Sequence, residues 1–238
     1  HVFIEKPMAM NQEEGQVLVD AAKTADVTVM VGYTQRFSES RRTMKSLIGR
    51  GAVGNILTVN AIKCGWPLTG WPADPTKGGG PLRYLGVHIT DQILWMLGDK
   101  AERVYAEIVW NQTTGAEQSC TYTIRFKSGV LVNVLCSQNS EQIDHLEIIG
   151  TDGRISTDWP ADVIQLQSKV IDEYRYPTTI RPEGDLRPAT YRDEMQAWID
   201  SLLEHRQPPI TGVDGIRVLE IIDAAFKSAQ TAMPVTLR

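Results

Sequence analysis

The first part of the chain carries a strand–helix–strand pattern, and this pattern constrains the fold more than any other feature. The apolar run 2–4 predicts a short buried strand. Asn11 then caps a predicted helix, with Glu14 three residues later, as in a capping box. The β-branched run 27–31 alternates little, which is typical of a parallel strand covered on both faces. Strand, helix and strand in this order form a βαβ unit, so we expect the tail of a doubly wound parallel sheet.

After residue 37 the pattern changes to many strands followed by helices. Strand-like runs occupy 56–62, 104–110, 121–126, 130–137, 145–149, 154–157 and 163–167. Helical patterns occupy 38–50, 84–97, a segment from about residue 190, and 213–232. Strands followed by helices indicate an α+β arrangement. We therefore predict two domains: residues 1–37 complete a parallel α/β sheet, and residues 38–238 form a mostly antiparallel open sheet with helices on one face.

Composition excludes several classes of function. The net charge of -5 and the lack of a basic stripe argue against a nucleic-acid partner. No apolar run approaches the ~18 residues of a membrane-spanning helix. Three cysteines without CxxC spacing predict reduced thiols and a cytoplasmic protein, and no cluster has the spacing of metal ligands. Because the chain opens on His1, directly before a strand, we expect a truncated chain that lacks the front of its parallel sheet.

The segment 49–54 matches the dinucleotide-binding pattern G-x-G-x-x-G letter for letter. That pattern binds a pyrophosphate only when a strand leads into it and a helix leads out of it. Here a predicted helix leads in and a predicted strand leads out. We therefore interpret the segment as a helix C-cap followed by a tight turn.

Glu5-Lys6-Pro7 follows the first predicted strand directly. In open α/β sheets, ligands bind at the carboxyl ends of the strands. Pro7 biases Lys6 towards an extended conformation, so its ammonium can point into a crevice. The alternative is an ordinary surface lysine at a strand end.

A second cluster lies in the segment 78–91. Three glycines at 78–80 precede Gly86-Val87-His88, and Asp91 follows one helical turn later on the face of His88. A lysine and a histidine at the ends of regular elements are the two proton-handling groups that reversible oxidation of an alcohol needs. The alternative for His88 is a histidine satisfied by a local backbone carbonyl.

Together these segments resemble the Gfo/Idh/MocA family of nicotinamide-dependent oxidoreductases. The resemblance covers essentially the whole chain, aligned with the last two thirds of the family, and implies the C-terminal remnant of a Rossmann sheet followed by the open-sheet domain. It implies hydride transfer between NAD or NADP and a hydroxyl of a sugar, cyclitol or sugar derivative in the full-length parent, the fragment alone being inactive. It also implies a dimer or tetramer built through the C-terminal sheet.

The resemblance also implies roles for particular residues. Lys6 and His88 fall on catalytic positions, and Asp91 and Trp71 on substrate-binding ones. The catalytic aspartate of the family falls on Tyr84, which we include in the catalytic set as a hydrogen-bond donor. The cofactor would be bound by Glu5, Lys6, Pro7, Gln35 and Arg36.

Four alternatives stay open at this point. Arg36 could form a surface ion pair instead of binding the cofactor, and the sequence favours neither role. Trp71 could anchor an interface instead of stacking on a sugar. Because a phenol cannot replace an ionised carboxylate electrostatically, Tyr84 also permits a catalytically silent sugar- or cofactor-binding regulator. The resemblance further allows a module that serves only oligomerisation, through the open face of the C-terminal sheet.

Overall fold

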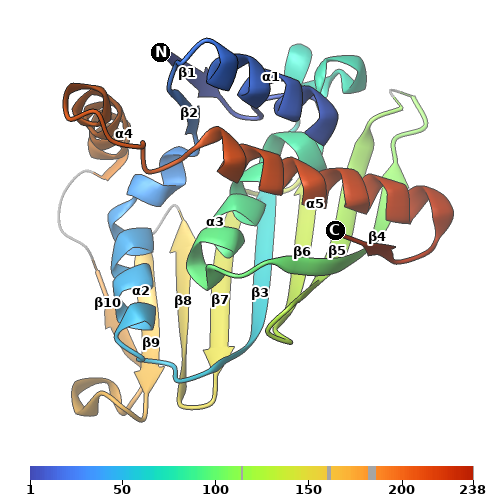
Figure 1. The fold of residues 1–238 in the computed structure, drawn as a ribbon. Coiled ribbons are helices and arrows are strands. Elements are labelled where there is room, and N and C mark those ends of the chain that lie inside the picture. The colour runs from blue at the N-terminus through green and yellow to red at the C-terminus, as the bar shows by residue number, and fades with distance from the viewer. Residues whose placement is uncertain (114, 160–161, 182–185, 238) are drawn as a thin grey trace.

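The computed structural model describes residues 1–113, 115–159, 162–181 and 186–237, which form two sheets with helices between and beside them (Figure 1). The first sheet contains β1 (Val2–Glu5) and β2 (Val29–Gly32), which run parallel and are joined by α1 (Gln12–Thr24). This is the predicted βαβ unit. Asn11 caps α1 by accepting a hydrogen bond from the Glu14 amide, at 2.9 Å.

The second sheet has nine strands in the order β10-β9-β8-β7-β3-β6-β5-β4-β11. Their bounds are β3 (Ile56–Gly65), β4 (Ala101–Trp110), β5 (Glu117–Phe126), β6 (Leu131–Gln138), β7 (Ile143–Gly150), β8 (Gly153–Trp159), β9 (Val163–Ser168), β10 (Thr178–Ile180) and β11 (Val235–Thr236). All pairs are antiparallel except the central pair β3–β6. The predicted, mostly antiparallel sheet is therefore confirmed.

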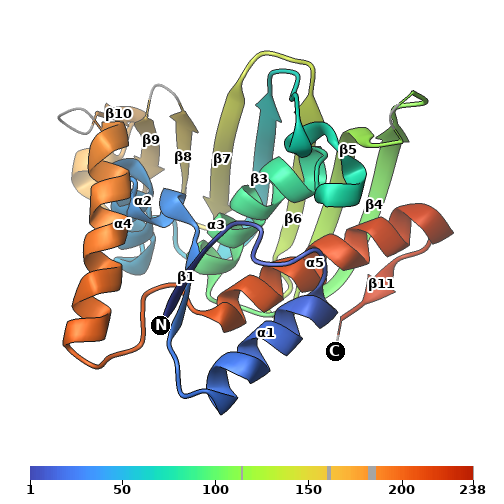
Figure 2. The same cartoon turned by 90° about the horizontal axis from the view of Figure 1, so that it is seen from above.

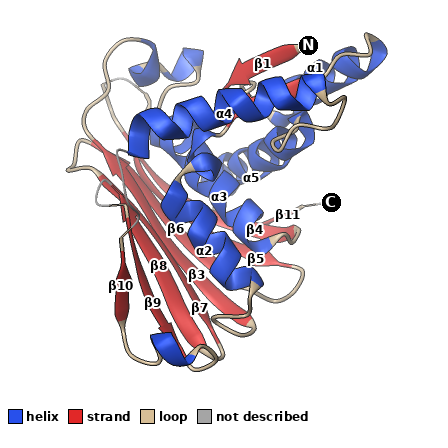
Figure 3. Ribbon diagram, turned by 90° about the vertical axis from the view of Figure 1, so that its left-hand side faces the viewer, coloured by secondary structure: helices blue, strands red, loops and turns tan. Residues whose placement is uncertain are grey.

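The helices cover one face of this sheet and leave the other open (Figures 2 and 3). They are α2 (Glu39–Gly49), α3 (Val87–Leu97) and α5 (Gly212–Thr231). A short 3-10 helix, η1 (Thr34–Phe37), links β2 to α2, and α4 (Leu186–Leu203) packs against η1. On β6, Val132, Val134 and Cys136 are buried under the helices. Leu131 and Leu135 alternate with them and are exposed on the open face. Successive side chains of the strand thus point alternately into the core and towards the open face.

Several details differ from the sequence predictions. The helix predicted over 84–97 begins with a π-helical turn, Leu82–Gly86, before α3. Strands β10 and β11 were not predicted, because three and two residues are too few for a recognisable alternation. The helical pattern predicts one apolar face on α4 with Tyr191, Met195, Trp198, Ile199 and Leu202. Trp198 and Leu202 are half-buried, whereas the other three are exposed.

The glycines at 49–54 form the predicted helix end and tight turn. Gly49 ends α2, and Gly51 and Gly54 adopt positive φ in the turn that leads into β3. A helix therefore leads in and a strand leads out, the reverse of a dinucleotide-binding loop. The predicted domain boundary at residue 37 falls between η1 and α2. Within the described residues, no helix has both the length and the hydropathy needed to cross a membrane.

Candidate active site

Lys6 lies at the carboxyl end of β1 and reaches across to the segment that precedes α3. Its ammonium donates a hydrogen bond to the backbone carbonyl of Tyr84, at 3.0 Å. The same Nζ lies 4.0 Å from the centroid of the Tyr84 ring, which is a cation–π contact. Two residues 78 positions apart in the chain are thereby held together.

Burial lowers the pKa of Lys6 from 10.5 to about 8, with Glu5 opposing the shift and Lys63 adding to it. An ammonium that loses its proton this readily exchanges protons near neutral pH far more easily than a surface lysine. The peptide bond between Lys6 and Pro7 is cis.

His88 lies in the first turn of α3 and is half-buried. Burial, followed by the positive charges of Lys6 and Lys63, lowers its pKa well below 6.5. The ring is therefore a neutral imidazole near neutral pH, the form that accepts a proton. Its Nδ1 is buried and has no hydrogen-bond partner among the described residues.

The three glycines before α3 permit close contact and do not act as a loose hinge. A Cβ on Gly78 would lie 2.8 Å from the sulfur of Met10, and one on Gly79 would overlap the carbonyl of Pro72. One on Gly80 would overlap the buried carboxylate of Glu117, which accepts a hydrogen bond from the Leu82 amide at 3.2 Å. The glycines let the loop settle onto β5 and onto the segment after Lys6.

The ring of Tyr84 lies between Lys6 and Trp71. Tyr84 and Trp71 make an edge-to-face contact, with centroids 5.7 Å apart and an interplanar angle of 73°. Trp71 is about half exposed, so part of its face is open to solvent. Lys6, Tyr84 and Trp71 therefore form one contiguous surface, and Tyr84 is the residue that joins the other two.

Arg36 and Asp91 meet in a buried ion pair. Arg36 Nη2 lies 2.5 Å from Asp91 Oδ1, and Arg36 Nε donates to Asp91 Oδ2 at 2.9 Å. Asp214, at the start of α5, lies 3.6 Å from Arg36 Nη2. Burial raises the pKa of Asp91 to about 6, opposed by Arg36. Arg36 does form an ion pair, but the interpretation of that pair as a surface feature is wrong. The pair is buried and joins η1, α3 and α5.

Gln35 also contacts protein groups. Its Nε2 donates to Asp144 Oδ2 at 2.7 Å, and its Oε1 accepts a hydrogen bond from Gln92 Nε2. Asp144 further pairs with Lys63 and with Arg41, the latter at 2.8 Å. Gln35 therefore belongs to a polar network between the nine-stranded sheet and the helices that cover it.

Sequence reasoning missed this network, although a signal for it exists. Lys63 falls in phase with the buried Val59 and Ala61 of β3, and Asp144 with the buried Leu146 of β7. A charge at an inward strand position needs a partner, and two opposite charges at such positions on neighbouring strands predict a buried pair. The network also contains Arg41 and Gln92.

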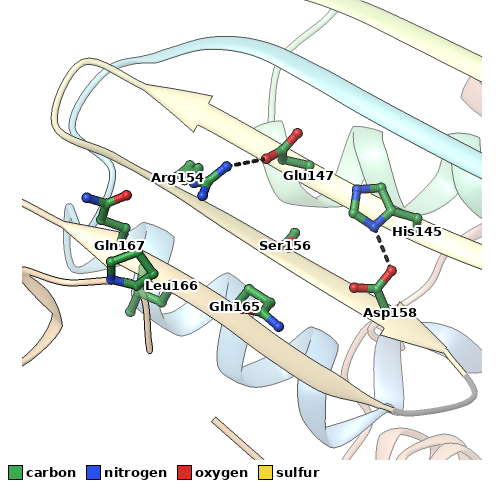
Figure 4. A pocket seen from close by; sticks show the side chains of 9 residues that line it. His145, Glu147, Arg154, Ser156, Asp158, Gln165, Leu166 and Gln167 are labelled. Carbon is green, nitrogen blue, oxygen red and sulfur yellow. Dashed lines mark hydrogen bonds and ion pairs between the residues drawn. The ribbon is translucent and has the colours of Figure 1, made fainter. Parts of the chain in front are cut away.

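A second polar feature lies on the open face of the sheet, away from Lys6 and His88. It is a depression of about 410 Å³, shown in Figure 4, and its floor is formed by β7, β8 and β9. His145 pairs with Asp158 at 2.7 Å, and Glu147 with Arg154 at 3.8 Å. No group of three or more metal-ligating side chains occurs within the ranges that the structure covers.

The chain resembles proteins of one family in both sequence and structure. The family model described as "GFO/IDH/MocA C-terminal domain" matches residues 41–156, and that described as "Oxidoreductase family, NAD-binding Rossmann fold" matches residues 1–33. Trans-1,2-dihydrobenzene-1,2-diol dehydrogenase of Danio rerio is 32% identical over 158 residues, which are 65% of this chain and 47% of that protein. Myo-inositol 2-dehydrogenase of Thermotoga maritima is 25% identical, over 100% of this chain and 72% of that protein.

A solved structure of levoglucosan dehydrogenase in complex with NADH superposes with a TM-score of 0.91 at 22% identity, covering 100% of this chain and 73% of that one. At this identity the superposition establishes the fold. The two family models together match more than half of the chain. The chain therefore belongs to the Gfo/Idh/MocA family of oxidoreductases, whose Rossmann fold binds NAD.

Proposed function

We propose that the protein is an NAD(P)-dependent oxidoreductase that acts on a hydroxyl group of a sugar, a cyclitol or a sugar derivative. The observation that carries this proposal is the electrostatic coupling of Lys6 and His88. Each is half-buried, and Lys6 is among the causes that lower the pKa of His88. Such a pair can bind and deprotonate an alcohol at neutral pH. Of the relatives named above, one is called an inositol dehydrogenase and another a levoglucosan dehydrogenase.

The cofactor fits the carboxyl edge of the β1–β2 sheet. An ammonium has three donors, and the described residues give Lys6 one hydrogen bond, to the Tyr84 carbonyl. Lys6 therefore retains donors for a ribose hydroxyl, and Glu5 and Pro7 flank it. Gln35 and Arg36 fit less well in this arrangement, because their polar atoms already contact Asp144, Gln92 and Asp91. When bound, NAD or NADP would supply hydride acceptance and donation.

The residues of this chain divide the proton chemistry between them. His88 would accept the hydroxyl proton of the substrate alcohol on its neutral imidazole. Lys6 donates a hydrogen bond to the substrate oxygen and stabilises the negative charge that develops there. The exposed part of the Trp71 ring offers an apolar surface for the C–H face of a sugar.

Tyr84 takes the position of the family aspartate, and we propose that it contributes by holding Lys6. Its carbonyl accepts from the ammonium, and its ring lies under the same atom. We assign Asp91 and Arg36 an indirect role, the fixing of α3 against η1. The relatives named above are all dehydrogenases, so they do not favour the silent regulator.

We further propose that the open face of the nine-stranded sheet pairs two copies of the chain. The support is a group of large apolar side chains exposed on that face, namely Val109, Leu131, Leu135 and Ile143. Light scattering at micromolar concentration tests this proposal, since a clean monomer would contradict it. We also propose a cytoplasmic location, because all three cysteines are free and buried thiols.

The function is tested on the full-length protein by a panel of sugars and cyclitols with NAD+ and NADP+, followed by the absorbance of the reduced cofactor. We expect at least one substrate, and we expect Lys6→Met and His88→Asn each to reduce kcat by about 10²–10⁴-fold. Lys100→Met and His205→Asn, in exposed positions, are the matched controls. Turnover by Lys6→Met at the wild-type rate, or no turnover with any member of the panel, would contradict the proposal.

A further inference from the structure

A chain of side-chain amides connects His88 to a buried carboxylate 56 residues away. Gln92 lies one turn after His88 on α3, and its Nε2 donates to Gln35 Oε1 and, at 3.3 Å, to the carbonyl of His88. Gln35 Nε2 in turn donates to Asp144 Oδ2 at 2.7 Å. Asp144 is held by Lys63 and Arg41 from neighbouring elements.

The ionised carboxylate of Asp144 determines the direction of each hydrogen bond along this row of side-chain amides. Burial alone would raise the pKa of Asp144, but Lys63 and Arg41 reverse the effect and the pKa is lowered. The carboxylate is therefore ionised and can only accept. Gln35 must present its NH2 group to Asp144, and hence its oxygen to Gln92. Gln92 must then present its own NH2 group to Gln35, and its oxygen is left over.

Two buried polar atoms without a hydrogen-bond partner remain at the end of this chain. Within the described part of the molecule, Gln92 Oε1 and His88 Nδ1 both lack a partner. Residues i and i+4 lie on the same helix face, with Cβ atoms about 5–6 Å apart. The first atom can only accept, and the second donates in one of the two neutral tautomers of histidine. Leaving either atom unpaired costs about 1–3 kcal/mol.

We propose that Gln92 is a positioning residue that fixes the tautomer of His88: Gln92 Oε1 accepts a hydrogen bond from His88 Nδ1–H, directly or through one water. His88 Nε2 is then left without a proton and faces the substrate as the acceptor. The base is thus oriented by a neighbour that is itself oriented, the logic of a catalytic triad built from amides. The proton-accepting role of Nε2 rests on the proposed function, whereas the tautomer does not.

The test is a long-range ¹H–¹⁵N NMR spectrum of the 238-residue chain without ligand. The His88 ring is identified by the signal that disappears in His88→Asn. We expect the Nδ1–H tautomer to exceed the Nε2–H tautomer by about tenfold, which is the ratio that one net hydrogen bond sustains. An excess of Nε2–H in the wild-type protein would overturn the proposal without any variant.

Two variants test the origin of the preference. Gln92→Met keeps the length of the side chain and removes its acceptor, so the tenfold preference should disappear. Gln35→Met keeps Gln92 but frees its amide to turn over, so an intermediate ratio is expected. Gln196→Met, in an exposed part of α4 where Gln196 bonds to Asp200, is the matched control and should change nothing.

Unchanged tautomer ratios in both folded variants would overturn the proposal. If Gln92→Met fails to fold, Gln35→Met carries the test, because Asp144 keeps Lys63 and Arg41 in that variant. If the tautomer behaves as expected but no substrate is turned over, the proposed function fails and the role of Gln92 in orienting His88 stands.

Discussion

Strand β7 contributes neighbouring residues to two polar clusters on opposite faces of the sheet, and the two clusters differ in their exposure to water. Asp144 points under the helices and is 1% exposed, with Lys63, Arg41 and Gln35 around it. His145, the next residue, points to the open face and pairs there with Asp158, which is 45% exposed. One step along a strand thus changes the surroundings from protein to water.

The contribution of a polar pair to stability therefore depends on the face on which it lies. An exposed pair contributes about 0–1 kcal/mol, because water solvates both charges nearly as well when they are apart. A buried pair contributes little net stability either, but removing one partner leaves an uncompensated charge. The inner cluster therefore fixes the geometry of Gln35, whereas the outer pairs remain in contact with water.

The largest difference between the faces is expected on removal of the carboxylates. Asp144→Ala leaves Lys63 and Arg41 buried without their shared partner, and should lower the free energy of unfolding by about 3–5 kcal/mol. Asp158→Ala on the open face should lower it by less than about 1 kcal/mol. Urea denaturation of both variants measures the two losses. Losses of equal size would show that the two faces do not differ as described.

Glycines extend the contrast between packed and open positions. Gly80 has a φ of +112°, and its Cβ position overlaps the Glu117 carboxylate, so Gly80→Ala should cost about 2 kcal/mol or more. Gly49 ends α2 with nothing within 4 Å of its Cβ position, so Gly49→Ala should stabilise by about 0.5–1 kcal/mol. Thermal unfolding ranks the two variants. A stabilised Gly80→Ala variant would contradict the close contact between Gly80 and Glu117.

A smaller effect is expected from Glu194 of α4. This carboxyl is buried, accepts from the Thr34 hydroxyl at 2.7 Å, and has its second oxygen unpaired among the described residues. Burial raises its pKa from 4.5 to about 7. The folded state therefore binds its proton more tightly than the unfolded state, and its contribution to stability is present below pH 4.5 and lost as the pH rises through 7.

Glu194→Gln should remove this pH-dependent loss of stability. The change in the free energy of unfolding between pH 4 and pH 8 should therefore be about 1–2 kcal/mol more favourable in the variant than in the wild-type protein. Denaturation at the two pH values measures the difference. Glu147→Gln, on the open face, is the matched control. A wild-type protein and a Glu194→Gln variant with parallel pH profiles would speak against a raised pKa.

Much of the fold could be predicted because its elements carry strong local patterns. The apolar runs at 2–4 and 27–31 and the cap at Asn11 define the βαβ unit without tertiary information. The apolar face expected on α4 is correct only in part. Trp198 of that face contacts Phe3 of β1, but the polar Glu194 also packs inward through its bond to Thr34 of η1, which a pattern of apolar residues does not predict.

The site was harder to predict than the fold. Lys6, Tyr84 and Trp71 were named from motifs, and the structure brings them into contact. Motifs give no information on partners, however, so the burial of Arg36 against Asp91 was not foreseen. Lys63, Asp144 and Gln92 lie in no motif, and their roles depend on which strands and helices are adjacent in the folded chain.

The most direct test of the account is the protonation of His88, followed by its ring ¹H and ¹⁵N shifts between pH 4 and pH 8. Burial, Lys6 and Lys63 lower its folded pKa well below 6.5, so the ring should remain neutral through pH 6.5. The unfolded chain takes up this proton first, so stability should fall as the pH drops from 6.5 towards the folded pKa. Lys6→Met should move the titration of His88 to higher pH, and Lys100→Met should not. A histidine that titrates at or above 6.5, unaffected by Lys6→Met, would contradict the coupling on which the proposed function rests.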